Sequence, residues 1–376
     1  MAKRVMLAVA GAGKTYHICH TIDPAKRNLI LAFTHENVHN IQRELHDAYG
    51  HIPKSTVVST FDAFVYHEMI LPYEPSIASY FKQPNFISQG ICTKDPPSRV
   101  IHTKSGKTIP NPDYKKKSEL GHYVTQNGHY YCSTLSELVL QVKGECGKLV
   151  QRVVNRLNKF YDCILIDEFQ DFREHDYNLI LTLAKGLNDL LLVGDYYQHS
   201  VSAKKNHGKP FESRGKDVSY SKFVEGLLQS GFSVDTSTLA KSRRCSAEVC
   251  AYVSRKLGIQ IESHDNHAGR VIFVDDKNIS RILEDSTILK LVYKEVDSYR
   301  FNAMNWSYSK GDTVDCACVI LTESFEALDA ETFETHKISQ STINKLYVAM
   351  TRSKGDLYLI RKSAFNCIEA QYRKQS

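Results

Sequence analysis

The sequence contains no apolar run of the roughly 18 residues that a membrane-spanning helix needs, which disfavours a membrane-embedded protein. The N-terminal segment MAKRVMLAVAGA has the basic start and short apolar run of a secretory signal. However, Gly13, Lys14 and Thr15 follow directly and favour a different role for this segment. None of the ten cysteines forms a Cys-x-x-Cys pair, so a zinc site is disfavoured and free thiols in a reducing compartment are indicated. We therefore expect a cytoplasmic protein without a membrane partner.

Internal repeats and low-complexity tracts are also missing, and the composition is that of an ordinary globular protein. A chain of 376 residues is long enough for two or three domains with separate cores. The net charge of +6 and the sequence pI of about 8.6 permit a polyanionic partner without establishing one.

Short β-rich apolar runs alternate with helical patterns along much of the chain. Strands are expected at 5–9, 28–33, 56–59, 163–166 and 190–193, and again at 271–274, 316–321 and 357–360. Val38, Ile41 and Leu45 follow one another at helical spacing within 35–45, and 247–257 is also typical of a helix. This alternation predicts an α/β fold with parallel sheets.

Residues 66–159 interrupt the alternation. The stretch holds seven prolines between 72 and 112 and a run of three lysines at 115–117. Asn127 and Gly128, within TQNGHYY, predict a hairpin turn. We predict that this stretch is an inserted subdomain with a small fold of its own.

A candidate phosphate-binding loop lies in LAVAGAGKTYHI, which starts at Leu7. An apolar strand runs into small residues and then into a helix, so that backbone N–H groups and the helix N-terminus can surround phosphate oxygens. Lys14 would reach the β and γ phosphates, and the Thr15 hydroxyl would bind Mg²⁺. Ala8 stands where the full consensus has glycine. The loop residues are Ala10, Gly11, Ala12, Gly13, Lys14 and Thr15.

A cluster of acids follows the predicted strand at 163–166, in the segment ILIDEFQDF. In phosphate-loop NTPases a second strand delivers an aspartate to the magnesium shell, and the carboxylate of Asp167 suits that hard cation. Glu168 is then the candidate base that orients and deprotonates the attacking water. The alternative is a strand end capped by solvated acids, which a neighbouring phosphate loop disfavours.

The segment DEFQD at 167–171 resembles the second motif of superfamily 1 helicases of the UvrD/Rep type. Six further segments resemble the remaining motifs in the expected order: LAFTHENV (31–38, Ia), STFDAF (59–64, Ib), LLVGDYYQ (191–198, III), LAKSRRC (239–245, IV), SYSKGDTVD (307–315, V) and LYVAMTRSK (346–354, VI). Together they span almost the whole chain, and seven motifs in order are far more specific than any one of them.

The resemblance implies two RecA-like domains that close on ATP. The first would comprise 1–65 and 160–237, the inserted subdomain 66–159, and the second 238–376. Only about sixty residues separate motif IV from motif V, so the large insertion that the family carries there is expected to be absent, and the chain would be a minimal member.

The family's ATP-site roles fall on residues of matching type. In the first domain Gln198 would sense the γ-phosphate beside Lys14 and Glu168. In the second domain Arg244 and Arg352 would act as arginine fingers on the charge that builds up in the transition state, and Gly311 would approach the same phosphate. Surface salt bridges are the alternative role for the two arginines.

The adenine site departs from the family pattern. The family places an arginine after the phosphate loop and a tyrosine before the motif IV arginine, whereas this chain has Tyr16 and Arg243 there. Both side chains present planes that stack on a base. We therefore predict that the base lies between Tyr16 and Arg243, with the positions of the aromatic residue and the arginine exchanged relative to the family. The upstream glutamine motif that reads adenine has no room before residue 5, which leaves the preference for ATP open.

Contacts with nucleic acid are implied by the resemblance of motifs Ia, Ib and V. The stacking aromatics that follow motif III in the family are replaced at 199–202 by His-Ser-Val-Ser. Tyr196 and Tyr197 are candidates to substitute for them, with packing near the ATP site as the alternative. The residues at the matching positions are Phe33, Thr34, His35, Ser59, Thr60, Phe61 and Ser309.

The sequence thus predicts an ATP- and Mg²⁺-dependent motor on single-stranded DNA, a helicase or translocase with 3′–5′ polarity if the family pattern holds. The alternative is a nucleic-acid-stimulated ATPase that acts as a sensor or switch, without unwinding by itself, beside a nuclease or another protein subunit in defence or repair. A binding module without turnover is disfavoured because all the predicted catalytic residues are present.

Overall fold

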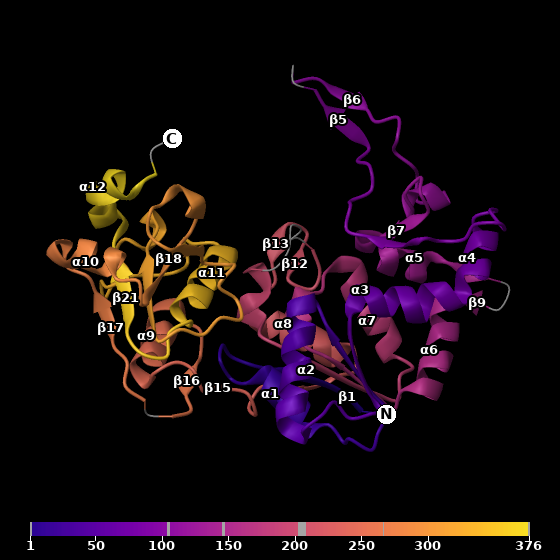
Figure 1. Cartoon of the computed structure of the whole chain (residues 1–376), viewed down its shortest axis with the longest axis horizontal. Helices are drawn as coiled ribbons and strands as arrows, with labels where there is room; N and C mark the ends of the chain where they lie inside the picture. The colour runs from indigo at the N-terminus through magenta and orange to yellow at the C-terminus, as the bar shows by residue number, and fades with distance from the viewer. Residues whose placement is uncertain (1, 104–105, 145–146, 202–207, 266, 375–376) are drawn as a thin grey trace. The chain divides into compact units, whose positions relative to one another are not determined.

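The computed structural model describes residues 2–103, 106–144, 147–201, 208–265 and 267–374 (Figure 1). The chain divides into two compact units. Unit 1 comprises Met1–Arg4, Ile18–Asp167 and Phe172–Leu192, and unit 2 comprises Val5–His17, Glu168–Asp171 and Val193–Ser376. The phosphate loop and most of the DEFQD segment therefore belong to the same unit as the C-terminal half of the chain. The domain boundaries expected from the sequence stay a prediction.

The first sheet has the strand order β14-β1-β11-β10-β2-β3, in which β14 is Ser233–Asp235. Its central strand β10 pairs in parallel with β2 on one side and with β11 on the other, and β2 pairs in parallel with β3. Ile164, Leu165 and Ile166 are buried, as expected for a strand covered on both faces. The strands are β1 (Ala2–Leu7), β2 (Asn28–Ala32), β3 (Thr56–Thr60), β10 (Cys163–Ile166) and β11 (Asp189–Gly194).

The predicted amphipathic helix forms as α2 (His35–Tyr49), with Val38, Ile41 and Leu45 buried. It begins where the Thr34 hydroxyl accepts a hydrogen bond from the Asn37 N–H, and it ends at Gly50, whose φ of 75° suits a residue without Cβ. Further helices of this unit are α3 (Phe61–Phe64), α6 (Leu149–Phe160) and α7 (Glu174–Ala184), and α1 (Lys14–Thr21) begins in unit 2 and ends in unit 1.

The stretch predicted as an insertion contains short elements within unit 1. The predicted turn at Gly128 is confirmed, because Thr125 and His129 pair around it and Gly128 has a φ of 77°. Strands β5 and β6 form a hairpin that stands away from helices α4, α5 and α7 in Figure 1. The elements are α4 (Glu74–Tyr80), α5 (Leu135–Gln141), β4 (Gly90–Cys92), β5 (Val100–His102), β6 (Thr108–Pro110), β7 (His129–Tyr131), β8 (Lys143–Gly144) and β9 (Gly147–Lys148), with a π-helix at Val65–Ile70.

Unit 2 holds a parallel sheet in the order β17-β21-β20-β18-β19. Trp306 and Phe325 are fully buried in this unit. The Ser246 hydroxyl caps α9, and Gly258 ends that helix in the left-handed conformation, so the predicted helix at 247–257 is confirmed. The strands are β17 (Val271–Phe273), β18 (Ile288–Val292), β19 (Ala303–Asn305), β20 (Cys316–Ile320) and β21 (Leu357–Ile360).

The rest of unit 2 consists of helices and short ladders. Its helices are α8 (Tyr220–Gln229), α9 (Ala247–Leu257), α10 (Ile279–Glu284), α11 (Gln340–Met350) and α12 (Lys362–Tyr372). Its short strands are β12 (Glu212–Ser213), β13 (Lys216–Asp217), β14 (Ser233–Asp235), β15 (Lys241–Ser242) and β16 (Glu262–Ser263).

The predicted α/β class with two parallel sheets is confirmed. Across the part of the chain that the structure describes, no helix combines the length and the apolar character that crossing a bilayer requires. The nine cysteines within the described ranges are free thiols, as predicted.

Candidate functional site

The phosphate loop connects β1 to α1, as predicted. Gly11 and Gly13 have φ values of 71° and 82°, which favour glycine. A Cβ at Gly11 would lie 2.6 Å from the Cβ of Arg244 and 2.7 Å from the Ser242 hydroxyl oxygen, so this position admits no side chain. Motif IV therefore packs directly against the loop within unit 2.

Lys14 is buried, and its Nζ lies 3.3 Å from Glu168 Oε1. Burial by itself raises the pKa of Glu168, but the ammonium groups of Lys14 and Lys310 outweigh it and lower that pKa to about 2. The Glu168 backbone has a φ of 52°, an uncommon value for a residue with a side chain. The predicted base is therefore a carboxylate at neutral pH, held beside the predicted phosphate-binding lysine.

Lys310 of motif V completes this charge cluster. Its Nζ donates to both oxygens of Asp171, at 2.7 and 2.8 Å, and lies 3.5 Å from Glu168 Oε2. Burial lowers the pKa of Lys310, and Asp171 and Glu168 reverse this so that the pKa is raised. The clustered acids of DEFQD are thus neutralised in part by two lysines from distant motifs. Sequence reasoning assigned no role to Lys310, although it precedes Gly311 in the quoted motif.

Gln170 links motif II to motif III. Its side-chain carbonyl accepts a hydrogen bond from the Asp195 N–H at 2.8 Å, and its amide donates to Glu168. A Cβ at Gly194 would lie 2.5 Å from that carbonyl oxygen, so glycine is needed where β11 ends. Glu168 and Asp195 are held at a fixed separation by one glutamine side chain.

Asp195 is a fully buried acid that the sequence analysis did not single out. Its Oδ2 accepts hydrogen bonds from Gln198 Nε2 at 2.8 Å and from the Tyr347 hydroxyl at 3.2 Å. The Tyr347 oxygen in turn accepts a hydrogen bond from the Ala10 N–H of the phosphate loop at 2.7 Å. Burial raises the pKa of Asp195 to about 6, with Lys14 acting in the opposite direction. The predicted γ-phosphate sensor Gln198 is therefore tied, through Asp195 and Tyr347, to the loop itself.

The two predicted arginine fingers lie at one end of α11. Arg352 is 1% exposed, and it donates from Nε to the Val348 carbonyl at 2.8 Å and from Nη1 to the Ser309 carbonyl at 3.0 Å. Within the described ranges its Nη2 has no hydrogen-bond partner. Burial and the neighbouring Arg244 lower the pKa of Arg352 to about 9.

Arg244 is part-buried and donates to the Thr351 carbonyl at 3.1 Å. Burial lowers its pKa as well. Across the part of the chain that the structure describes, neither arginine forms an ion pair with a carboxylate. A buried and a part-buried guanidinium group with no counter-ion among the described residues favour the binding of an anion.

The residues predicted to sandwich the base flank the loop. A Cβ at Gly13 would lie 3.7 Å from Arg243 Cδ and 3.7 Å from Tyr16 Cβ. Tyr16 is 51% exposed, and Arg243 is also exposed. Gly311 has a φ of 97° beside Lys310.

The residues that resemblance assigned to nucleic acid have mixed environments. In unit 1, Thr34 and His35 are exposed at the start of α2, whereas Thr60 caps α3 and Phe61 is buried against Phe172 at 4.7 Å between ring centroids. Phe33 and Ser59 are half-buried, and in unit 2 Ser309 is fully buried, with its hydroxyl donating to the Trp306 carbonyl.

The two tyrosines of motif III pack into an aromatic cluster of unit 2. Tyr196 is buried and contacts Phe211 and Phe223. Tyr197 stacks on Tyr220 with an interplanar angle of 11° and meets Tyr347 edge-on. The sequence left two roles open for these tyrosines, stacking on nucleic acid or packing near the ATP-site residues. These contacts favour packing.

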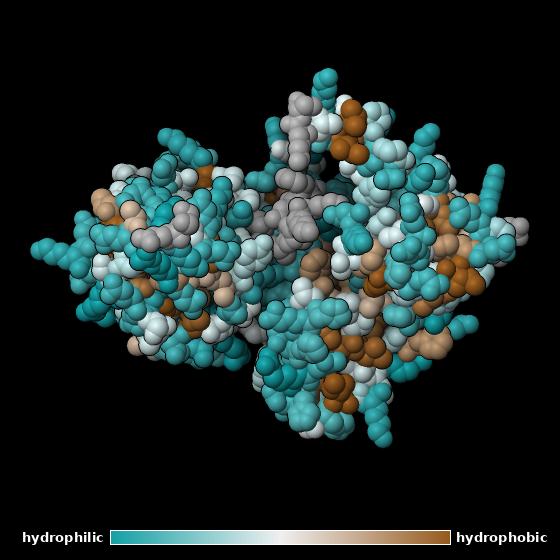
Figure 2. Space-filling view, turned by 45° about the horizontal axis from the view of Figure 1, so that its top comes forward, coloured by the Kyte–Doolittle hydropathy of each residue, from teal (hydrophilic) through white to brown (hydrophobic). Residues whose placement is uncertain are grey.

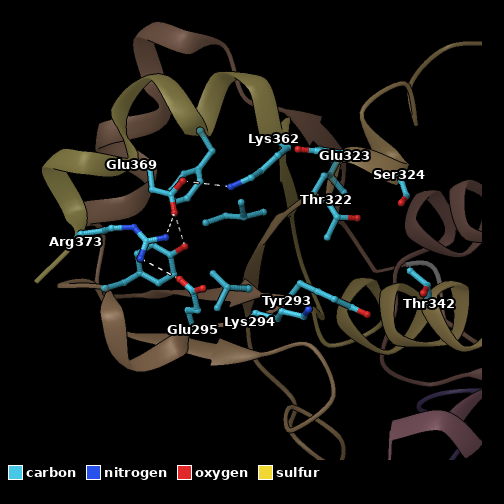
Figure 3. A pocket seen from close by; sticks show the side chains of 15 residues that line it. Tyr293, Lys294, Glu295, Thr322, Glu323, Ser324, Thr342, Lys362, Glu369 and Arg373 are labelled. Carbon is cyan, nitrogen blue, oxygen red and sulfur yellow. Dashed lines mark hydrogen bonds and ion pairs between the residues drawn. The ribbon is translucent and has the colours of Figure 1, made fainter. Parts of the chain in front are cut away.

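A separate cavity of about 500 Å³ lies in unit 2 beyond the carboxyl ends of β18 and β20 (Figure 3). Four of its charged groups pair with one another, since Glu369 meets Lys362 and Arg373, and Arg373 also meets Glu295. Its lining holds three basic and three acidic side chains, and none of the predicted site residues lines it.

Comparison with known families gives one match. Residues 104–200 match the family model described as UvrD/REP helicase N-terminal domain. This part of the chain is therefore similar to the N-terminal domain of such helicases. Together with the seven ordered motifs, this match supports the resemblance to the superfamily 1 helicases. A comparison with curated protein sequences finds no match.

Two solved helicase structures overlap with this chain to a limited extent. The structure of PRRSV helicase is 13% identical with a TM-score of 0.44, and the overlap covers 99% of this chain and 54% of that one. The complex of arterivirus nonstructural protein 10 (helicase) with DNA is 14% identical with a TM-score of 0.44, covering 96% and 62%. This chain thus spans 54–62% of the length of those helicases. The resemblance to the superfamily 1 helicases rests on the match over residues 104–200 and on the motif order, and not on these overlaps.

Proposed function

We propose that this protein is an ATP-dependent motor on single-stranded DNA that requires Mg²⁺ and moves with 3′–5′ polarity. The observation that carries the ATPase part is the environment of Arg352. A buried guanidinium whose Nη2 has no partner among the described residues, with a second arginine beside it, suits a multiply charged anion, and a γ-phosphate is such an anion.

The loop and the acids support the same proposal. Backbone N–H groups of residues 10–15 would hold the phosphates, and the base would stack between Tyr16 and Arg243. The Thr15 hydroxyl and the Asp167 carboxylate are oxygen donors of the kind that Mg²⁺ prefers. When bound, that ion would neutralise charge on the β and γ phosphates.

Hydrolysis would require a rearrangement of the charge cluster. Glu168 is now held by Lys14 and Lys310, and a base for water must have a free oxygen. Binding of the triphosphate would draw Lys14 toward phosphate and leave Glu168 available. Gln198, which Asp195 holds by a hydrogen bond, would sense the γ-phosphate on behalf of motif III.

A second candidate is an ATPase that responds to nucleic acid without unwinding it. Only residues 293–302 connect β18 to β19, so no additional domain is present in this connection. Such a subunit would act with a nuclease or another protein partner.

Two measurements on the purified chain separate these functions. The ATPase rate is measured with and without single-stranded DNA, RNA and closed duplex, and strand displacement is followed on duplexes with a 3′ or a 5′ tail. Stimulation by single strands together with displacement from a 3′ tail supports the motor. Stimulation without displacement supports the sensor, and the absence of ATP hydrolysis under every condition contradicts both.

A further inference from the structure

The hairpin of β5 and β6 forms an arm on unit 1, defined here as residues 99–103 and 107–111. Ile101 pairs directly opposite Ile109 in an antiparallel ladder. The ladder continues at both ends, since the Asn111 N–H donates to the Arg99 carbonyl at 3.0 Å and the Thr103 N–H donates to the Lys107 carbonyl at 2.8 Å. All six residues of the two strands are exposed.

One face of the arm combines apolar and basic side chains. Successive residues of a strand point to opposite faces, so Arg99, Ile101, Lys107 and Ile109 share one face of the arm. On this face Ile101 lies opposite Ile109, with Arg99 opposite Asn111 toward one end and Lys107 opposite Thr103 toward the other. Ile101 is 41% exposed and Ile109 is 44% exposed. Figure 2 shows apolar surface, in brown, toward the upper end of the molecule, where this hairpin lies in Figure 1.

Exposure of this face to water alone is energetically unfavourable. An isolated two-stranded ribbon has little stability of its own, and an exposed pair of isoleucines adds none. Arg99 and Lys107 form no ion pair within the described ranges. Two free cations on either side of an apolar pair are complementary to a base, whose face is apolar, and to the phosphates that flank it.

We infer that this face of the arm binds nucleic acid where a base is unstacked, with the isoleucines against the base and the two cations on phosphates. The inference deepens the proposed function, because it names a second contact of the same partner. The occupant is a single strand, since a duplex buries the faces of its bases.

Binding measured without nucleotide tests the arm. One variant carries Ile101→Ser and Ile109→Ser, a second carries Arg99→Ala and Lys107→Ala, and Ile87→Ser is the control because Ile87 is a 73% exposed isoleucine outside the arm. The isoleucine variant should bind a labelled single-stranded oligonucleotide several-fold more weakly, with unchanged affinity for a closed circular duplex. The variant with Arg99→Ala and Lys107→Ala loses two phosphate contacts. Its plot of log K against log salt concentration should therefore be shallower, with a slope about 1.4 less negative for a single strand. The control should bind as the wild type does.

Unchanged affinity and salt slope in both double variants would overturn the inference. The same holds if the isoleucine variant loses affinity for a protein partner and not for nucleic acid. This assay needs no hydrolysis. A chain that binds single strands through the arm but hydrolyses no ATP would therefore contradict the proposed motor, while the inference about the arm would still hold.

Discussion

The hydroxyl oxygen of Tyr347 accepts a hydrogen bond from the backbone N–H of Ala10, across 337 positions of the chain. The same hydroxyl donates to Asp195, so a motif VI side chain is hydrogen bonded to both the phosphate loop and motif III. The geometry gives Tyr347 a place between the groups proposed to bind and to sense the γ-phosphate.

Tyr347→Phe should destabilise the protein and weaken the response to ATP. The ring still fills its site, but the buried Ala10 N–H and Asp195 carboxylate lose a partner, which costs about 1–3 kcal/mol. Urea unfolding measures the loss, and Tyr308→Phe is the control because Tyr308 is 81% exposed. Equal stabilities of the two variants would show that the buried hydroxyl contributes nothing.

Glu168→Gln should abolish hydrolysis while sparing ATP binding. The amide has nearly the same shape and cannot take a proton from water, so kcat should fall by about 10²–10⁴. Equilibrium binding of a labelled ATP analogue checks that the site is intact, and Glu334→Gln at an exposed position is the control. A variant that turns over ATP at the wild-type rate removes Glu168 from the role of base.

Arg352→Lys should lower kcat by about 10³ without preventing nucleotide binding, since an ammonium group cannot donate in the fork geometry of a guanidinium. Arg352 also donates to three backbone carbonyls, so thermal melting must accompany the rate measurement. Arg270→Lys, at an exposed arginine, is the control. A melting temperature near that of the wild type together with an unchanged kcat would contradict the finger role.

Tyr16→Ala should raise the KM for ATP, because the base loses one face of its sandwich. Tyr16→Phe keeps the ring and should leave KM unchanged, which makes it a matched control. Arg243→Ala should act in the same direction as Tyr16→Ala. If KM stays constant in both alanine variants, the predicted sandwich does not exist.

Asp195 should make stability depend on pH. Its pKa rises from a usual value of 3.8 to about 6 in the folded chain, so the folded state holds a proton that the unfolded state has already lost between these values. This contribution therefore decreases as pH rises from about 4 to 6 and is constant above that range. Relative to Asp195→Asn, the wild type should lose up to about 3 kcal/mol over this interval.

Urea midpoints at several pH values check this prediction, and Asp276→Asn, at an exposed aspartate, is the control. A difference between wild type and Asp195→Asn that is flat from pH 4 to pH 7 would mean that Asp195 is not held in a protonated state by burial.

Much of the fold was predictable because its signals are local. The strand at 163–166 and the helix at 247–257 form with the predicted bounds. The strand is recognised from a short run of apolar residues and the helix from its serine cap, and each signal lies within a few neighbouring positions. The small residues around Gly11 predicted the phosphate loop for the same reason. Lys310 was missed because its partner Asp171 lies 139 positions away.

By itself the sequence determined the motif order, the alternation of strands and helices, and the types of residue available to bind phosphate, metal and base. Only the tertiary structure decided which of them meet. Glu168 is bound by two lysines, Tyr347 bridges Ala10 and Asp195, and Ser309 turns out to be buried. The physical reason is that charge pairing and buried hydrogen bonds act over a few ångströms in space, whatever the separation along the chain, whereas a sequence pattern records only neighbours.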